Sequence, residues 1–379
     1  MHIQCTKDVL SSAVNIVQKA VQSSSSIEVY AGIFIEASDS GLTIVGTNTD
    51  LSIKTRAKAS IFKTGKVLIE GKLFSDIVRK WPAGKPINIV YDENTNNVII
   101  DDGNENSSFK AEVKSMNVED YPAFPDAEKD IEEGLAKSWD ISQSLLKKAV
   151  NATAFAAARV DHSRVYLTAI LLESKEGFLR VVATDSHRMG YYQIPGVDGD
   201  ISAMITADDL SDIAKLMDEE DEEKIINLTL TPRRAFFDFD DTTVVTRLIE
   251  GNFPPYERVI PTSHTTKVKV DRRTIVDAVD RIAVMVRGGS SLAVRLTVAD
   301  NSLTINSGEM EYGSAKEQVY VEKEGEDLEI KVDYRFLFEG LKAFTGESVE
   351  MMFKGPDSAI LFKSKEMPGY IYLMMPLNF

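Results

Sequence analysis

The feature that most constrains the fold of this chain is a helical stretch that occurs three times. Residues 6–21, 142–157 and 271–286 share an Ala-Val-Asn or Ala-Val-Asp step and apolar residues spaced three and four apart. That spacing is typical of a helix with one buried face. Three equivalent helices are therefore predicted, and each opens on a common helix-capping residue: Thr6, Ser142 or Asp271.

A second helix and a pair of strands also recur in each repeat. The fold class is therefore predicted as α+β, with three repeated domains that each pack two helices on antiparallel sheets. A single large α/β domain is less favoured, because a parallel sheet needs strands that alternate with helices. The second helices are 71–81, 207–217 and, more loosely, 333–344. The strand pairs are 87–101, 226–241 and 349–364, and further strands are expected in 41–57 and 302–308.

Two of the repeats close on similar proline-containing segments, which suggests where the domains end. EDYPAFP at 119–125 resembles GNFPPYERVIP at 251–261, and an acidic stretch follows the first of them. We therefore expect a first domain at 1–125, an acidic linker at 126–136, a second domain at 137–255 and a third at 256–379.

The composition bounds the class of protein. A hydrophobic content of 43% over 379 residues excludes wholesale disorder. The single cysteine, Cys5, rules out an intrachain disulfide and fits a reducing compartment. The N-terminus lacks the apolar core of a secretory signal, and no apolar run is long enough to span a membrane. The net charge of −16 argues against tight binding of nucleic acid through neutralised phosphates.

The charge is unevenly distributed, which changes what it implies. Five of the six predicted helices are net positive, whereas loops such as 217–224 carry the acidic residues. This pattern fits an assembly with a mildly basic lining and an acidic exterior, which would act on a polyanion through its long-range field.

Domain size limits what such an assembly could enclose. A domain of about 125 residues is roughly 35 Å wide. Three such domains in a ring leave a hole of only ~5 Å, whereas six leave one of roughly 35 Å. Duplex DNA passes through the second hole and not the first, so this chain could encircle DNA only as a dimer.

Three motifs of the chain resemble those of the bacterial DNA polymerase III beta subunit family, the DNA sliding clamps. They are ATDSHRM at 183–189, LIEGNFPPYERVIP at 248–261 and MMPLNF at 374–379, and the resemblance covers the whole chain. It implies a non-catalytic processivity factor without cofactor or metal. It implies a head-to-tail homodimer, closed into a six-domain ring around double-stranded DNA of any sequence, that tethers the replicative polymerase. A clamp loader would open the ring with ATP, in the bacterial cytoplasm, and the loaded ring would accompany the nucleoid.

The resemblance further implies a peptide-binding cleft between the second and third domains. Short linear motifs of the polymerase subunit, other polymerases, the clamp loader and repair proteins would dock there. Apolar residues would line a pocket for an anchor side chain, and His187 and Arg188 would register the peptide at the rim. The implied cleft residues are Leu167, Thr184, Ser186, His187, Arg188, Met189, Pro254, Arg258, Val259, Leu373, Met374, Met375, Pro376 and Leu377.

Other residues are implied to contact a second copy or DNA. At the dimer interface, the expected pairing sets Leu73, Phe109 and Ala111 against Val284 and Met285 of the other copy. The expected DNA-facing residues are Lys72, Arg164 and Tyr166. The chain departs from the family pattern at Ser23–Ser26, at Glu28-Val29-Tyr30, in the loop before Arg164 and at its end, Asn378-Phe379.

An enzyme, a metal site and a protein–protein scaffold are the alternatives to a sliding clamp. An enzyme using Asp185, Ser186 and His187 is disfavoured, because neighbours in an extended strand point to opposite faces and cannot form a relay. A metal site is disfavoured because the four histidines, His2, His162, His187 and His264, show no ligand spacing. An acidic protein–protein scaffold that never meets DNA is the alternative that the charge alone would favour.

Overall fold

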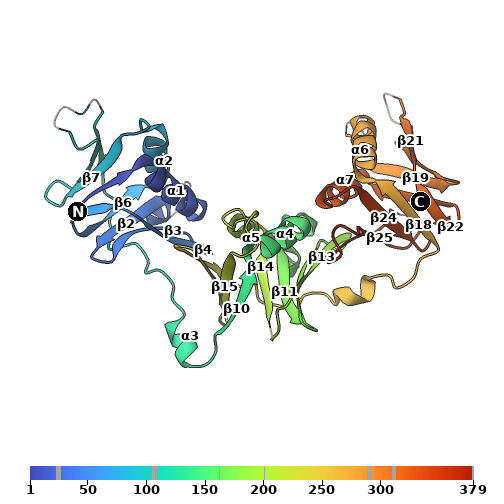
Figure 1. The fold of residues 1–379 in the computed structure, drawn as a ribbon, viewed down its shortest axis with the longest axis horizontal. Coiled ribbons are helices and arrows are strands. Elements are labelled where there is room, and N and C mark those ends of the chain that lie inside the picture. The colour runs from blue at the N-terminus through green and yellow to red at the C-terminus, as the bar shows by residue number, and fades with distance from the viewer. Residues whose placement is uncertain are drawn as a thin grey trace. The chain divides into compact units, whose positions relative to one another are not determined.

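The computed structural model describes residues 1–22, 27–104, 107, 109–161, 163–199, 201–287, 292–309 and 313–377 (Figure 1). Outside these residues lie His162, one of the four histidines, and two of the segments that depart from the family pattern, Ser23–Ser26 and Asn378-Phe379. The chain forms two compact units. The first comprises Met1–Ser142 and Glu223–Leu248, and the second comprises Gln143–Glu222 and Ile249–Phe379.

The first unit contains two sheets with helices packed on them (Figure 1). Its strand orders are β5-β1-β7-β8-β9 and β10-β15-β16-β17-β4-β3-β2-β6. Its helices are α1 (Lys7–Val17), α2 (Gly71–Lys80) and the short α3 (Glu128–Glu132). Its strands are β1 (His2–Thr6), β2 (Gly32–Ser38), β3 (Gly41–Thr47), β4 (Leu51–Ala57), β5 (Ser60–Lys63), β6 (Gly65–Glu70), β7 (Pro86–Asp92), β8 (Asn97–Asp101), β9 (Ala111–Lys114), β10 (Lys137–Ser142), β15 (Ile225–Leu230), β16 (Arg234–Phe239) and β17 (Thr242–Arg247).

The second unit has the same kind of architecture. Its strand orders are β14-β11-β12-β13-β26-β25-β24-β18-β22 and β21-β20-β19-β23. Its helices are α4 (Gln143–Thr153), α5 (Ala207–Ala214), α6 (Arg272–Val286) and α7 (Tyr334–Ala343). Its strands are β11 (Ala169–Lys175), β12 (Phe178–Thr184), β13 (Arg188–Pro195), β14 (Ser202–Thr206), β18 (Thr266–Asp271), β19 (Ala293–Ala299), β20 (Ser302–Asn306), β21 (Lys316–Tyr320), β22 (Glu322–Gly325), β23 (Leu328–Asp333), β24 (Ser348–Phe353), β25 (Ile360–Lys363) and β26 (Tyr370–Met374).

These elements confirm the predicted α+β class and the threefold repeat. The helix pairs α1–α2, α4–α5 and α6–α7 occupy the same place in each repeat, and the two helices of each pair pack against each other. The strands that flank them pair antiparallel, as between β1 and β7, β10 and β15, and β18 and β24.

Two of the predicted helix caps, Thr6 and Asp271, stand at the N-cap positions, but only Asp271 caps with its side chain. The Asp271 carboxylate accepts a hydrogen bond from the Thr274 amide at 2.8 Å, which is the expected cap of α6. Thr6 stands at the cap position of α1, but its side chain makes no capping bond. Because Thr6 is exposed, water can satisfy the first amides of that helix instead.

Continuous sheets cross from one repeat to the next. In the first unit the fourth strand of the first repeat, β4, pairs with the last strand of the middle repeat, β17. In the second unit β13 of the middle repeat pairs in the same way with β26 of the third. The middle repeat is therefore shared between the two units, whose borders do not coincide with the expected domain borders.

No helix in the described ranges is long and apolar enough to cross a membrane.

Candidate docking surface beside the β13–β26 junction

The motif ATDSHRM forms a tight turn between β12 and β13. Ser186 has a φ of 79°, and the Asp185 carboxylate accepts hydrogen bonds from the amides of His187 at 2.9 Å and Arg188 at 3.0 Å. The expectation that Asp185, Ser186 and His187 lie in an extended strand was wrong, because this carboxylate bonds the backbone two and three residues on and closes a turn.

The Asp185 carboxylate serves this turn and the neighbouring arginine. Its second oxygen lies 2.9 Å from the Arg188 Nε, and neither residue is well exposed. Arg188 also pairs with Glu339 of α7, and its guanidinium lies 4.5 Å from the centre of the Phe336 ring. These contacts attach the turn to the third repeat and offer no relay of the serine protease kind.

The two faces of the sheet at the junction have different partners. Gly190 of β13 faces α4, since a side chain there would meet the Thr153 backbone at 2.9 Å. Alternation then places Met189 and Tyr191 on the face away from the helices. The side chain of Arg188 lies on the same face of the sheet as Gly190, toward the helices. Arg188 and Met189 therefore point to opposite faces.

A cluster of buried apolar residues lies on the face away from the helices; we call it the apolar patch. Two of its members, Met189 of β13 and Leu373 of β26, pair with each other across the junction. The patch comprises Ala169, Leu171, Val182, Met189, Tyr191, Met204, Tyr256, Leu361 and Leu373, with Tyr166, Ile249, Phe253, Ile260, Met352, Ala359 and Ile371 packed against it.

Apolar side chains adjoining the patch in the sequence remain exposed. Val259 is 53% exposed, Met375 40% and Leu377 36%. The Met375 amide donates to the His187 carbonyl at 2.8 Å, which extends the junction by one bond. Alternation therefore places Met375 on the same side as Leu373.

The segment that connects the second and third repeats contributes to the patch. The Ile249 amide donates to the Met204 carbonyl at 2.8 Å, and the short 3₁₀ helix Tyr256–Val259 follows. The Tyr256 ring is buried in the patch, and burial raises the pKa of its hydroxyl well above the usual range. Hydrogen bonds from Lys175 and Arg180 lower the pKa of Glu257.

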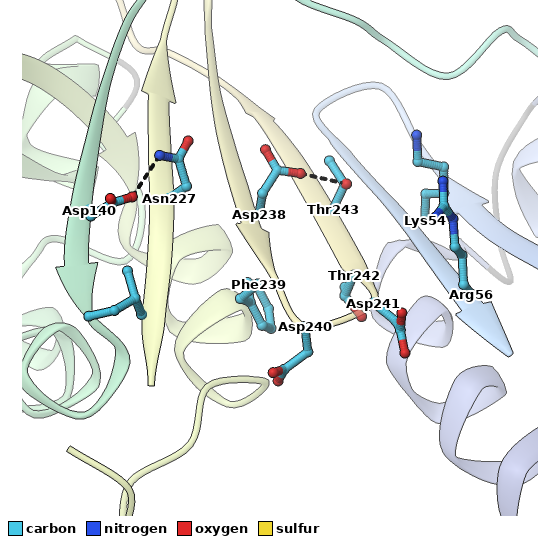
Figure 2. Close-up of a pocket in the computed structure, with 11 residues that line it drawn as sticks. Lys54, Arg56, Asp140, Asn227, Asp238, Phe239, Asp240, Asp241, Thr242 and Thr243 are labelled. Atoms are coloured by element: carbon cyan, nitrogen blue, oxygen red, sulfur yellow. Dashed lines mark hydrogen bonds between the residues drawn. The ribbon is translucent and has the colours of Figure 1, made fainter. Parts of the chain in front are cut away.

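The corresponding face of the first unit is polar along a row that spans the β17–β4 junction, although the sheet there is built in the same way. Helix α1 packs on β3 and β4, and the row on the opposite face runs across five neighbouring strands. Figure 2 shows the side chains of this row beside a pocket, with Asn227 hydrogen-bonded to Asp140 and Thr243 to Asp238. These bonds are 2.8 and 2.6 Å long, and the pocket has a volume of about 420 Å³. The row consists of Asp140, Asn227, Asp238, Thr243 and Lys54.

The contrast holds at the two junctions themselves: Thr243 pairs with Lys54 in the first unit, whereas Tyr191 pairs with Ile371 in the second. Farther along the first unit the same row continues through Val45 and Phe34, which line an apolar hollow. At the β13–β26 junction a comparable row runs through Leu171, Val182, Tyr191 and Ile371. Exposed apolar area beside such a row is the usual mark of an interaction site.

The structure brings only part of the predicted cleft onto the patch. Met189 and Leu373 belong to it, and Tyr166, expected to face DNA, packs against it. Met374 is buried in the core on the helix side. Leu167 is buried in the short helix before β11. The remaining predicted cleft residues are exposed or half-buried: Thr184, Ser186, His187, Pro254, Arg258 and Pro376.

Other predicted residues lie away from the patch or beside the turn. Arg164 pairs with Asp161 at 3.0 Å and donates to the Ser186 hydroxyl at 3.2 Å. Lys72 is exposed on the first turn of α2. The expected interface residues Leu73, Phe109 and Val284 are 45%, 49% and 71% exposed, Ala111 begins β9 and Met285 is half-buried on α6. Glu28-Val29-Tyr30 forms most of a 3₁₀ helix, Glu28–Ala31.

Sequence reasoning missed Arg180, which anchors the connecting segment through Tyr256 and Glu257. The only signal was an arginine in an otherwise apolar strand, FLRVVAT at 178–184. No group of three or more His, Cys, Asp or Glu side chains in the described residues could hold a metal ion.

Comparisons with known proteins cover the whole chain. Models of the DNA polymerase III beta subunit match its N-terminal domain at 1–125, its central domain at 140–255 and its C-terminal domain at 257–378. The beta sliding clamps of Bacillus subtilis and Caulobacter vibrioides are each 27% identical, over 395 and 385 residues, with full coverage of both proteins.

Solved structures agree with these matches. The DNA polymerase sliding clamp of Bacillus subtilis has a TM-score of 0.90 at 25% identity and covers 100% of this chain and 99% of that one. The beta subunit of Streptococcus pyogenes DNA polymerase has a TM-score of 0.91 at 24% identity, with full coverage of both chains.

Proposed function

The chain belongs to the DNA polymerase III beta subunit family of DNA sliding clamps, and we propose that two copies close head to tail into a six-domain ring around duplex DNA. The ring is a non-catalytic tether of the bacterial cytoplasm that holds the replicative polymerase on its template. Membership of this family does not favour the alternative function, an acidic protein–protein scaffold that never meets DNA. We place the domains at 1–125, 137–255 and 256–379, joined by the linker 126–136.

Strand order is the observation that carries the ring. At both junctions inside the chain, the fourth strand of one repeat pairs with the last strand of the next repeat. These pairs are β4 with β17 and β13 with β26. Strand β21 holds the fourth place in the third repeat, and β9 holds the last place in the first. Each lies at the end of its sheet in the described part of the chain.

Two free edges of matching kind favour pairing between copies. An unpaired strand edge readily accepts another strand, and repeating the internal junction between β21 of one copy and β9 of the other closes a ring of six domains. Ala111 begins β9, and α6, which carries Val284 and Met285, packs on β21. Three of the predicted interface residues, Ala111, Val284 and Met285, therefore belong to these edge strands or to the helix packed on one of them, which supports the proposal.

The grip on DNA is topological, because the charges are locally compensated. On α4, Lys147 lies 3.4 Å from Glu219 and Lys148 lies 3.6 Å from Glu222. Glu219 and Glu222, the acidic partners, are exposed, and both pairs reduce the positive field of the helix. Lys72, Arg164 and Tyr166 remain the residues that we assign to the DNA side.

The test of encirclement uses DNA topology. Clamps assembled on a nicked circular plasmid by the clamp loader and ATP should remain bound through gel filtration in high salt. Cutting the plasmid once with a restriction enzyme should release them. Binding that fell equally with salt on circular and linear DNA would show ordinary electrostatic association and would contradict the ring.

We assign the apolar patch and the exposed residues adjoining it to the docking of short linear peptides. An extended peptide with apolar anchors would cover Val259, Met375 and Leu377, and polymerases, the clamp loader and repair proteins would compete for this surface. Met189 and Leu373 would form the floor, and His187 would lie at the rim.

A matched pair of variants tests this assignment. Met375→Asp should lower the affinity for a fluorescein-labelled peptide with Leu and Phe anchors by more than tenfold, as measured by fluorescence anisotropy. The reason is that the substitution places a charge in the apolar contact. Ile131→Asp, at a 59% exposed residue of α3, should leave the affinity unchanged. Equal affinities for both variants would place the docking site elsewhere.

A further inference from the structure

One buried arginine holds the segment that connects the second and third repeats. Arg180 of β12 is 5% exposed, although arginine is seldom buried. Its guanidinium donates to the Tyr256 hydroxyl at 3.3 Å and pairs with Glu257, both from that segment. The other side of the guanidinium lies 2.7 Å from Glu176.

The partners of Arg180 are themselves held by β11. The Tyr256 hydroxyl donates to Glu173 at 2.6 Å, and the Lys175 ammonium donates to Glu257 at 2.7 Å. Tyr256 is thus fixed at both ends, since its ring packs beside Tyr191, 5.8 Å between centroids. Within this network Arg180 and Tyr256 are buried, whereas Glu176, Glu257 and Lys175 reach solvent. Removing Arg180 therefore leaves the buried Tyr256 hydroxyl without its donor and releases Glu257 from its attachment to β12.

The same short helical turn carries the exposed residues assigned to docking. Tyr256–Val259 is a single 3₁₀ turn, in which the Arg258 amide donates to the Pro255 carbonyl at 3.2 Å. The first half of the turn, Tyr256 and Glu257, bonds to Arg180, although only Tyr256 is buried. The second half, Arg258 and Val259, is exposed and makes no side-chain bond to Arg180. A shift of the anchored half therefore displaces the exposed half.

We propose that Arg180 is a positioning residue of the docking surface: it fixes Tyr256 and Glu257 and thereby sets where Pro254, Arg258 and Val259 meet a bound peptide. Arg180 itself does not contact the peptide. This inference rests on the docking role proposed above, and it predicts that peptide affinity depends on a side chain buried behind the surface.

The test compares two arginine variants of the full-length dimer. Arg180→Met should bind the labelled peptide with Leu and Phe anchors at least tenfold more weakly in fluorescence anisotropy. It should remain a dimer in light scattering. The control is Arg295→Met, which removes an exposed pair with Glu329 at 3.0 Å and should stay within twofold of the wild type. Arg180→Lys keeps the charge but not the forked donors, so its affinity for the peptide should lie between those of Arg180→Met and the wild type.

A structural readout separates positioning from general damage. In Arg180→Met, hydrogen exchange of the Arg258 and Ile260 amides should quicken, while exchange in the strands of the other sheet, such as β19, stays unchanged. Tyr256→Phe, which removes one oxygen, should weaken the peptide about threefold. The double variant, Arg180→Met with Tyr256→Phe, should lose less binding free energy than the sum of the two single losses, because both substitutions act through one contact.

The outcomes distinguish this inference from its premise. If wild type does not bind the peptide, the docking assignment fails, and the inference fails with it. If wild type binds and a dimeric Arg180→Met binds within twofold of it, the positioning role of Arg180 is refuted. Should Arg180→Met not fold, unchanged peptide affinity in Tyr256→Phe refutes it equally.

Discussion

Two tyrosines on β26 provide a controlled comparison of a bonded and an unbonded buried hydroxyl. Tyr370 and Tyr372 point to the same face and are 1% and 0% exposed. The Tyr372 hydroxyl donates to the Phe336 carbonyl at 2.9 Å. The Tyr370 hydroxyl has no hydrogen-bond partner among the described residues, and burial raises its pKa well above the usual value.

Replacing each tyrosine by phenylalanine should change stability in opposite directions. A buried hydroxyl without a partner costs about 1–3 kcal/mol, whereas an ordinary hydrogen bond contributes about 1 kcal/mol. Tyr370→Phe should therefore raise the free energy of unfolding by about 1 kcal/mol, after the lost packing of one oxygen, and Tyr372→Phe should lower it by about 1 kcal/mol. For a unit of roughly 200 residues, a difference of about 2 kcal/mol separates the two melting temperatures by about 4–8 °C.

Differential scanning calorimetry of the two variants and the wild type measures this directly. The comparison should use the transition of the second unit, followed at several protein concentrations so that dimer dissociation is recognised. Tyr370→Phe melting at or below Tyr372→Phe would refute the reasoning, because it would mean that the Tyr370 hydroxyl has a stabilising partner.

Three further outcomes are expected. Gly340→Ala should destabilise the second unit by about 1–3 kcal/mol in urea denaturation, because an added Cβ would lie 2.0 Å from the Tyr372 ring; helix propensity alone predicts the opposite sign. Val284→Glu should give monomers in light scattering, whereas Val160→Glu, at a similarly exposed residue outside the expected interface, should stay dimeric; a dimeric Val284→Glu would argue against this interface. Hydrogen bonds from Lys85 and then Ser107 lower the pKa of Asp102 from 3.8 to about 2, so its contribution to stability is present above pH 4 and is lost as the pH falls toward 2. In Lys85→Met the carboxyl should titrate closer to 3.8 in an NMR titration, and an unchanged value would rule out Lys85 as the main cause.

Much of the fold could be predicted from the sequence because the signals were local. The apolar spacing in 6–21, 142–157 and 271–286 predicted the helices that the structure places at α1, α4 and α6. Strand alternation predicted the hairpins that follow the second helices. Local errors arose where short-range bonding overrides periodicity, as in the turn closed by Asp185.

The candidate site was only partly predictable, since its geometry depends on which face each side chain takes. Arg188 and Met189 are neighbours in the motif, yet one packs on Phe336 and the other lies in the apolar patch. Arg180 was missed because its partners, Tyr256 and Glu257, lie in another segment more than 70 residues away.

By itself, the sequence determined the three repeats and their principal helices and hairpins, because apolar spacing along the chain defines these, and its three motifs indicated the family. Only the tertiary structure decided that β4 pairs with β17 and β13 with β26, and that the second of these junctions has an apolar outer face. It also explained why α7 has Gly340 at the position that Ile77 takes in α2 and Ile213 in α5, since the Tyr372 ring occupies that space. These features arise from contacts between residues distant in the chain, and no local pattern records which of them will meet.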